Sequence, residues 1–197
     1  MIVTGTRPLQ SGEHALIGAI IGESFADDPV NRWVFRDPRG MTAFYRLVAK
    51  KLYLRRGFGH VCGDAGGSLW LPPGVDKSIP LWHSLDTAVA MIRYGGVGAI
   101  ARGLAVDGFL AGRRPAAPHY YLYAIGARPS RQGAGIGGRL MAAGLEPVDR
   151  DRMPAYLESS KESNVGFYRR FGFRVTERIV PARGCPPMWL MWREAGG

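Results

Sequence analysis

The sequence predicts a mixed α/β fold in which helices flank one central sheet. An unbroken apolar run at residues 119–125 is typical of a strand that is buried on both faces. A glycine-rich turn follows this run, and an apolar stripe of helical spacing begins at Ile136. Shorter strand and helix patterns occur on both sides of this central segment. The chain therefore mixes the two kinds of element along its whole length.

The N-terminal part predicts a strand, two helices and a pair of strands. A short strand at residues 2–6 precedes a helix at residues 13–25, for which Ser11 is a candidate N-cap. The tripeptide Asp27-Asp28-Pro29 ends this helix, and residues 30–40 are expected to form a loop. A second helix is expected from residue 41 to about residue 54. Residues 60–63 and 68–71 then predict paired strands around a glycine-containing turn.

The remaining elements lie on either side of the central segment. Residues 78–114 predict a helical insert of one or two helices, interrupted at Gly95-Gly96. The helix that begins at Ile136 is expected to stop at Pro147. A strand at 155–158, a short helix at 164–171 and strands at 173–180 and 188–193 complete the chain. All residues, 1–197, are expected to form a single domain with a sizeable core.

Composition restricts the classes of partner. The formal charge is +10, yet the arginines are dispersed without a basic run, so nucleic acid is not expected as a partner. The excess charge suits an anionic ligand, and it also suits a genome that favours arginine codons. Cys62 and Cys185 have neither metal-ligand nor redox spacing. With no signal peptide and no membrane-spanning stretch in the sequence, a cytoplasmic location without a metal or membrane partner is expected.

The glycine-rich turn presents bare backbone N–H groups at the start of a helix, which is an arrangement that holds phosphate. Its letters satisfy the G-x-G-x-x-G pattern from Gly133 to Gly138, and Glu158 follows at the distance typical of a dinucleotide site. The spacing argues against that interpretation, because a dinucleotide site places its first glycine directly at the end of the strand. Here residues 126–132 intervene, and too few residues follow Gly138 for a doubly wound sheet.

A second interpretation fits the same turn. The pattern Gln132-x-x-Gly135-x-Gly137, after a strand and a short proline turn, resembles the acetyl-CoA motif of the GNAT-type N-acetyltransferases. Asn164-x-x-x-Tyr168, within SNVGFYRRFGF, resembles the other recognisable segment of that superfamily. The predicted element order is also that of the GNAT acyltransferase fold. The resemblance covers about residues 119–193, and LYAIGARP, LWLPPG and MWLMWRE are most similar to the puromycin-acetyltransferase-like small-amine group.

The resemblance implies an activity and a cosubstrate. A chain of this family would transfer the acetyl group of acetyl-CoA to an amine by direct attack in a ternary complex, without a metal. The residues it implies for pyrophosphate binding are Gln132, Gly133, Ala134, Gly135, Gly137 and Gly138. The backbone of Ile125 and Ala127 would pair with the pantetheine arm, and Asn164 would touch it. Asn164 could also be a helix cap.

Two residues are implied for catalysis. Tyr168 is the candidate general acid for the departing sulfur, and its alternative role is that of a core aromatic residue. Glu158 is the candidate base, and its alternative role is that of a surface carboxylate at the end of a strand. Asp27, Asp28 and His119 are lesser candidates for the base, and a chain of waters could replace it altogether.

The acceptor is expected to be a small-molecule amine whose identity the sequence leaves open. Phe25, Trp33 and Trp82 are candidate residues of its binding site, although each also fits an ordinary core. The resemblance is compatible with a homodimer. Two alternative functions remain at this point: a non-catalytic acyl-CoA-binding or regulatory domain, and a dinucleotide-binding oxidoreductase.

Overall fold

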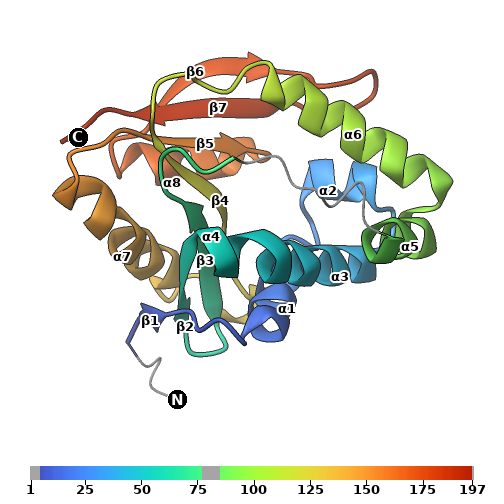
Figure 1. The fold of residues 1–197 in the computed structure, drawn as a ribbon, viewed down its shortest axis with the longest axis horizontal. Helices are drawn as coiled ribbons and strands as arrows, with labels where there is room; N and C mark the ends of the chain where they lie inside the picture. Colours follow the sequence, from blue (N-terminus) through green and yellow to red (C-terminus); the bar gives the residue numbers. More distant parts are fainter. Residues whose placement is uncertain (1–4, 77–84, 197) are drawn as a thin grey trace.

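A computed structural model describes residues 5–76 and 85–196 of the chain. Within these residues the strands form one mixed sheet in the order β1-β2-β3-β4-β5-β7-β6, and helices lie on both of its faces (Figure 1). This arrangement confirms the predicted α/β fold class. The strands are β1 (Arg7–Pro8), β2 (Phe58–Cys62), β3 (Gly66–Leu71), β4 (Tyr120–Ala127), β5 (Ala155–Ser159), β6 (Arg174–Ile179) and β7 (Met188–Arg193).

The predicted strands are confirmed with small shifts of their ends, except at the N-terminus. Of the strand expected at residues 2–6, residues 2–4 lie outside the described residues, and pairing with β2 begins only at Arg7, opposite Val61. Pro8 lies in this pair, on the edge of the sheet, where a missing N–H does little harm.

The central strands separate partway along their length. β4 and β5 are parallel and pair from Tyr120 to Leu122. β4 continues to Ala127, whereas β5 pairs with β7 as far as Ser159. The C-terminal half of β4 therefore leaves its neighbour, and a gap opens within the sheet.

A β-bulge in β4 lies at the point of separation. Ala124 pairs with Leu69 and Leu122 pairs with Trp70, so Tyr123 has no partner residue on β3. A bulge shifts the alternation of side chains by one position. As a result, Tyr123 and Ala124 both pack on the face of the sheet that carries Tyr121.

That face is covered by the N-terminal helices. They are α1 (His14–Ser24), α2 (Pro29–Val34), α3 (Pro38–Val48), a π-helical segment η1 (Ala49–Tyr53) and α4 (Leu54–Arg56). The two expected helices are present, but the loop predicted at residues 30–40 is wrong. Asp28 caps α2 by accepting a hydrogen bond of 2.8 Å from the backbone N–H of Asn31, and Asp37 caps α3 in the same way through Arg39. A proline follows each cap at the first helical position, where its fixed φ favours a helix.

The described part of the insert, from residue 85 onward, contains two helices, α5 (Leu85–Gly95) and α6 (Val97–Ala111), and residues 78–84 lie outside the described residues. They are separated by Gly96, whose φ of 71° is one that other residues rarely adopt. This confirms the predicted interruption at the glycine pair. α6 runs beside α2 and reaches the face of the sheet that α1 and α3 cover (Figure 1).

The opposite face carries α7 (Ile136–Arg150) and α8 (Val165–Arg169) (Figure 1). The prediction that α7 stops at Pro147 is wrong, since the helix continues to Arg150. A proline inside a helix costs about 3 kcal/mol. Leu145 and Val148 are buried against the sheet on either side of it, and each buried side chain of this size contributes about 1.5–3 kcal/mol, which offsets that cost. In the described ranges no helix has the length and apolar content needed to cross a bilayer.

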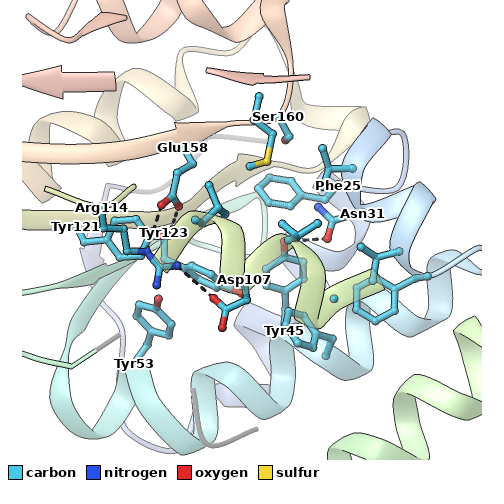
Figure 2. Close-up of a pocket in the computed structure, with 18 residues that line it drawn as sticks. Phe25, Asn31, Tyr45, Tyr53, Asp107, Arg114, Tyr121, Tyr123, Glu158 and Ser160 are labelled. Carbon is cyan, nitrogen blue, oxygen red and sulfur yellow. Dashed lines mark hydrogen bonds and ion pairs between the residues drawn. The ribbon is translucent and has the colours of Figure 1, made fainter. Parts of the chain in front are cut away.

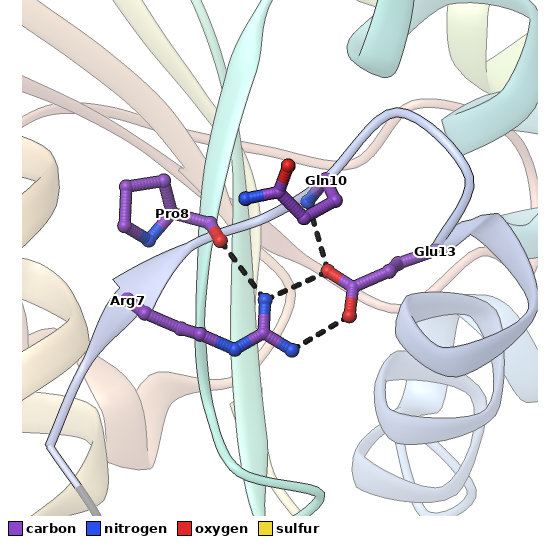
Figure 3. A network of polar contacts seen from close by, with 4 residues as sticks. All are labelled: Arg7, Pro8, Gln10 and Glu13. Atoms are coloured by element: carbon purple, nitrogen blue, oxygen red, sulfur yellow. Dashed lines mark hydrogen bonds and ion pairs between the residues drawn. The ribbon is translucent and has the colours of Figure 1, made fainter.

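The start of α1 is held by Glu13 rather than by Ser11. No side chain caps the helix, and the expectation for Ser11 is wrong. Instead the Glu13 carboxylate accepts hydrogen bonds from the Arg7 guanidinium at 2.6 and 2.9 Å and from the backbone N–H of Gln10 at 2.8 Å (Figure 3). The network ties β1 to α1. The bonds from Arg7 and Gln10 lower the pKa of Glu13 from 4.5 to about 2.

We expect Glu13→Gln to lower the melting temperature at pH 7 by a small amount, about one degree, because an ion pair this exposed contributes little. A lowered folded-state pKa means that the contribution is present above pH 4.5 and is lost as the pH falls toward 2. The difference between variant and wild type should therefore shrink over that window in thermal melts. Glu162→Gln at another exposed glutamate is the matched control. An equal effect of both substitutions at all pH values would contradict the role of this network.

Candidate active site

The gap between β4 and β5 is the mouth of a cleft of about 600 Å³. Its walls come from the end of β4, the glycine-rich turn, the start of α7, the loop after β5 and α8. Most of the residues expected to bind cofactor or to catalyse line it: Ile125, Ala127, Gln132, Gly133, Gly135, Gly137, Gly138, Glu158, Asn164 and Tyr168. Ala134 belongs to the same turn but is exposed and does not line this cleft.

The glycine-rich turn exposes the N-terminus of α7 to the cleft. Gly135 is the N-cap residue, with a left-handed φ of 71°, and no side chain caps the helix. The first turn of α7 contains no acidic residue. The free N–H groups and the positive end of the helix dipole therefore point to an anion as the ligand. Arg131 and Arg170 also line the cleft and add positive charge.

The end of β4 offers a second binding surface. Beyond Leu122 this strand has lost its pairing with β5, and residues 123–127 line the cleft. Peptide groups on such an open edge can hydrogen-bond an extended ligand, as in β-strand addition.

Asn164 and Tyr168, from the start of α8 and from within it, line the same cleft. Asn164 is exposed and occupies the N-cap position of α8, but its side chain makes no capping hydrogen bond. The expectation that it caps the helix is therefore wrong. Tyr168 is 8% exposed, with the ring centroid of Phe167 at 5.3 Å. Its ring thus packs as a core residue would, while the residue also lines the cleft. Burial, with a further contribution from Asp28, raises the pKa of Tyr168, so the phenol is protonated at neutral pH.

Glu158 is buried, and the expectation of a surface carboxylate is wrong. Its side chain is 5% exposed. One carboxylate oxygen lies 3.3 Å from Nε of Arg114, and the other accepts a hydrogen bond from the Tyr121 hydroxyl. Such partners are what allow a carboxylate to remain charged inside a protein.

The lesser candidates for the base are engaged elsewhere. Asp27 forms an exposed ion pair with Lys161. Asp28 lines the cleft, but its oxygens accept hydrogen bonds from Asn31 and Ser160. The His119 Nδ1 atom lies 2.7 Å from the Ala117 carbonyl oxygen, and the ring packs beside Tyr156 and Trp192 without lining either cavity. Among the described residues no group of three potential metal ligands comes together.

A smaller cavity of about 150 Å³ adjoins the cleft (Figure 2). The two share Phe25, Tyr123, Glu158 and Ser160, which therefore mark the junction. α2, α3, α6 and β4 supply most of its wall. Burial raises the pKa of the Tyr45, Tyr53 and Tyr121 phenols well above the usual value, so these rings are neutral.

The predicted acceptor-binding residues have different positions. Phe25 lines both cavities. Trp33 lines neither, and its ring lies 5.9 Å from the guanidinium of Arg102. The reason is that residues 29–34 form a helix. Its turn directs Val30 and Val34 toward the cavity and Trp33 away from it. Trp82 lies outside the described residues.

Several residues of the smaller cavity were missed. The sequence analysis identifies neither Arg114 nor Asp107, and it treats the tyrosines of β4 only as part of an apolar run. The available signal was the repetition of tyrosine at 120, 121 and 123, because a buried phenol usually needs a polar partner.

The site is thus a cleft between splayed parallel strands, with an uncapped glycine turn at one end and a buried carboxylate at the other. In the comparison with known proteins, residues 88–175 match the family model of the acetyltransferase (GNAT) domain. The chain is 35% identical over 65 residues to a mycothiol acetyltransferase of Brachybacterium faecium, a match that covers 32% of this chain and 20% of that relative.

Solved structures share the fold. One from Corynebacterium glutamicum, described as histone acetyltransferase HPA2 and related acetyltransferase, has a TM-score of 0.74 at 22% identity and covers 100% of this chain and 98% of its own. The NatC complex bound to Gag peptide and CoA has a TM-score of 0.52 at 11% identity, with 96% of each chain covered. At these identities the likeness concerns the fold.

Proposed function

We propose that this chain transfers the acetyl group of acetyl-CoA to the amine of a small molecule, by direct attack in a ternary complex. The observation that carries the proposal is the junction of the two cavities at Glu158. One cavity has an anion-binding turn, and the other is a separate pocket of mainly apolar wall. Two substrates can thus be present together with their reacting ends at the same place, which direct transfer requires.

The residues of the cleft suit acetyl-CoA as the cosubstrate. The N–H groups after Gly135 would hold the pyrophosphate, with Arg131 or Arg170 adding charge-assisted bonds. The open edge of β4 and the uncommitted side chain of Asn164 would bind the pantetheine arm.

The reaction then needs two proton movements. The amine gives up a proton to Glu158, directly or through water, and its lone pair attacks the carbonyl carbon of the thioester. As the carbon–sulfur bond breaks, Tyr168 gives its proton to the sulfur. The products are an amide and the free thiol of CoA.

The two alternative functions, acyl-CoA binding without catalysis and dinucleotide-dependent oxidoreduction, require different structural features. A domain that only binds acyl-CoA needs the cleft alone, whereas the second pocket with its carboxylate at the junction favours an enzyme. A dinucleotide site needs a doubly wound parallel sheet. In the described sheet β4 and β5 are the parallel pair and the other pairs are antiparallel, so this topology does not support a dinucleotide enzyme.

We expect the purified protein to bind CoA and acetyl-CoA in calorimetry and not to bind NAD. Binding should weaken as salt is added, because charged phosphates meet a basic turn. A thiol-release assay with acetyl-CoA and a panel of amines then tests transfer. Binding of NAD without binding of CoA, or thiol release that no amine stimulates, would contradict the proposal.

A further inference from the structure

The smaller cavity restricts the acceptor by its size. Its volume of about 150 Å³ is close to that of an apolar protein cavity that holds one benzene molecule. The wall is a connected aromatic cluster: Tyr53 stacks on Tyr123 at 4.6 Å, Tyr45 lies 6.0 Å from Tyr123, and Phe25 packs edge-on against Tyr45 at 5.4 Å. A cavity of this size, with this aromatic wall, suits an acceptor whose apolar part is about as large as one aromatic ring.

The cavity also restricts the charge of the acceptor. Among the described residues that line it, Glu158, Asp107 and Arg114 carry formal charge. Arg114 lies between the two carboxylates, at 3.3 Å from each (Figure 2). Two negative charges and one positive charge leave the pocket with a net charge of −1. One ammonium group would bring it to neutrality.

The position of the unbalanced charge indicates where the ammonium group lies. Glu158 is at the junction with the cleft, whereas Asp107, which belongs to α6, lines the smaller cavity and not the cleft. An ammonium beside Glu158 would face the place where the thioester is expected. The tyrosine rings around it are neutral and would add cation–π attraction.

We infer that the acceptor is an amine with a single positive charge and an apolar body about the size of one aromatic ring, as in phenethylamine. The inference rests on the proposed function and specifies its substrate class. Arg114 is the specificity-determining residue, because it already neutralises one of the two carboxylates. A diamine would bring a second ammonium into a pocket that one ammonium already neutralises, and close to the positive charge of Arg114. An aminoglycoside exceeds the cavity in both size and charge.

The experiment compares phenethylamine with the diamine cadaverine by thiol release from acetyl-CoA, as the ratio of their kcat/KM values. Wild type should prefer phenethylamine by about tenfold or more, the factor that 1.4 kcal/mol of discrimination gives. Arg114→Met leaves two unbalanced carboxylates and should shift the ratio toward cadaverine by at least about tenfold. Arg114→Lys retains the positive charge and should keep the wild-type preference. A merely structural role would lower both rates equally and leave the ratio unchanged.

Asp107→Asn keeps the test decisive if Arg114→Met fails to fold, because the Asp107 side chain is 31% exposed and tolerates substitution. It removes the net negative charge and should raise the KM for phenethylamine by several-fold more than the KM for acetyl-CoA. A wild-type preference for cadaverine, or an unchanged ratio in Arg114→Met together with an unchanged KM in Asp107→Asn, would overturn the inference while leaving acetyl transfer intact. If CoA binds but no amine is acetylated, the proposed function itself fails.

Discussion

Gly138→Val is expected to weaken CoA binding by roughly a hundredfold or more, without unfolding the protein. Gly138 lies in the first turn of α7 and lines the cleft, and a Cβ added there meets no atom within 4 Å. A valine side chain would therefore project into open space where the pyrophosphate is expected. Each charge-assisted hydrogen bond that is lost weakens binding by about 1.5–3 kcal/mol, so losing two gives a factor of this size.

Gly138 tests the phosphate site more directly than Gly135, the N-cap residue of α7. The φ of 71° at Gly135 would strain any side chain, so a substitution there could act through the fold. Gly108→Val is the matched control, because a Cβ at Gly108 in α6 also meets no atom within 4 Å and the residue lines neither cavity. Calorimetry with CoA and thermal melts measure both effects. Tight CoA binding by Gly138→Val would place the phosphate site elsewhere.

Tyr168→Phe is expected to lower kcat and kcat/KM together by roughly ten- to a thousandfold, as for the loss of one general acid. The substitution removes one oxygen and keeps the ring contacts with Phe167 and Phe173. Affinity for acetyl-CoA should change little, since the phenol acts on charge that develops only as the carbon–sulfur bond breaks. Stability should change by no more than about 1 kcal/mol.

Tyr120→Phe is the control for the loss of a phenol outside the cleft. Its hydroxyl bonds Asp151, so this variant should lose some stability and no turnover. Normal turnover with a lower melting temperature in Tyr168→Phe would make Tyr168 a core residue only. A large loss of CoA affinity would make it a ligand contact instead.

The pH dependence of kcat also tests the role of Tyr168. A general acid supports turnover below its pKa and is lost as the pH rises through that value. Burial raises the pKa of Tyr168 above its ordinary value near 10. We therefore expect wild-type kcat to show no fall between pH 8 and pH 10. A loss of turnover in that range that Tyr168→Phe lacks would contradict the raised pKa.

The central strand, the glycine-rich turn and the order of the elements could be predicted from the sequence. These features depend on local chemistry: a continuous apolar run, glycines where φ is positive, and the break at Gly95-Gly96. Two local signals of a helix start were missed, one taken as the end of the preceding helix and the other placed within a predicted loop. Asp28 and Asp37, each followed by a proline, begin helices α2 and α3.

The smaller cavity and the length of α7 depend on contacts between distant parts of the chain. Pro147 remains helical because burial of its neighbours outweighs its local cost. Glu158, Arg114 and Asp107 lie on β5, after α6 and within α6, and only the fold brings their charges into contact. The face of the sheet on which Ala124 packs likewise depends on a bulge in the pairing of β4 with β3. Contacts between residues far apart in the chain leave no periodic signal. This is why most of the residues predicted for the cleft do line it, whereas few of the described residues that line the smaller cavity were predicted, Phe25 and Glu158 among them.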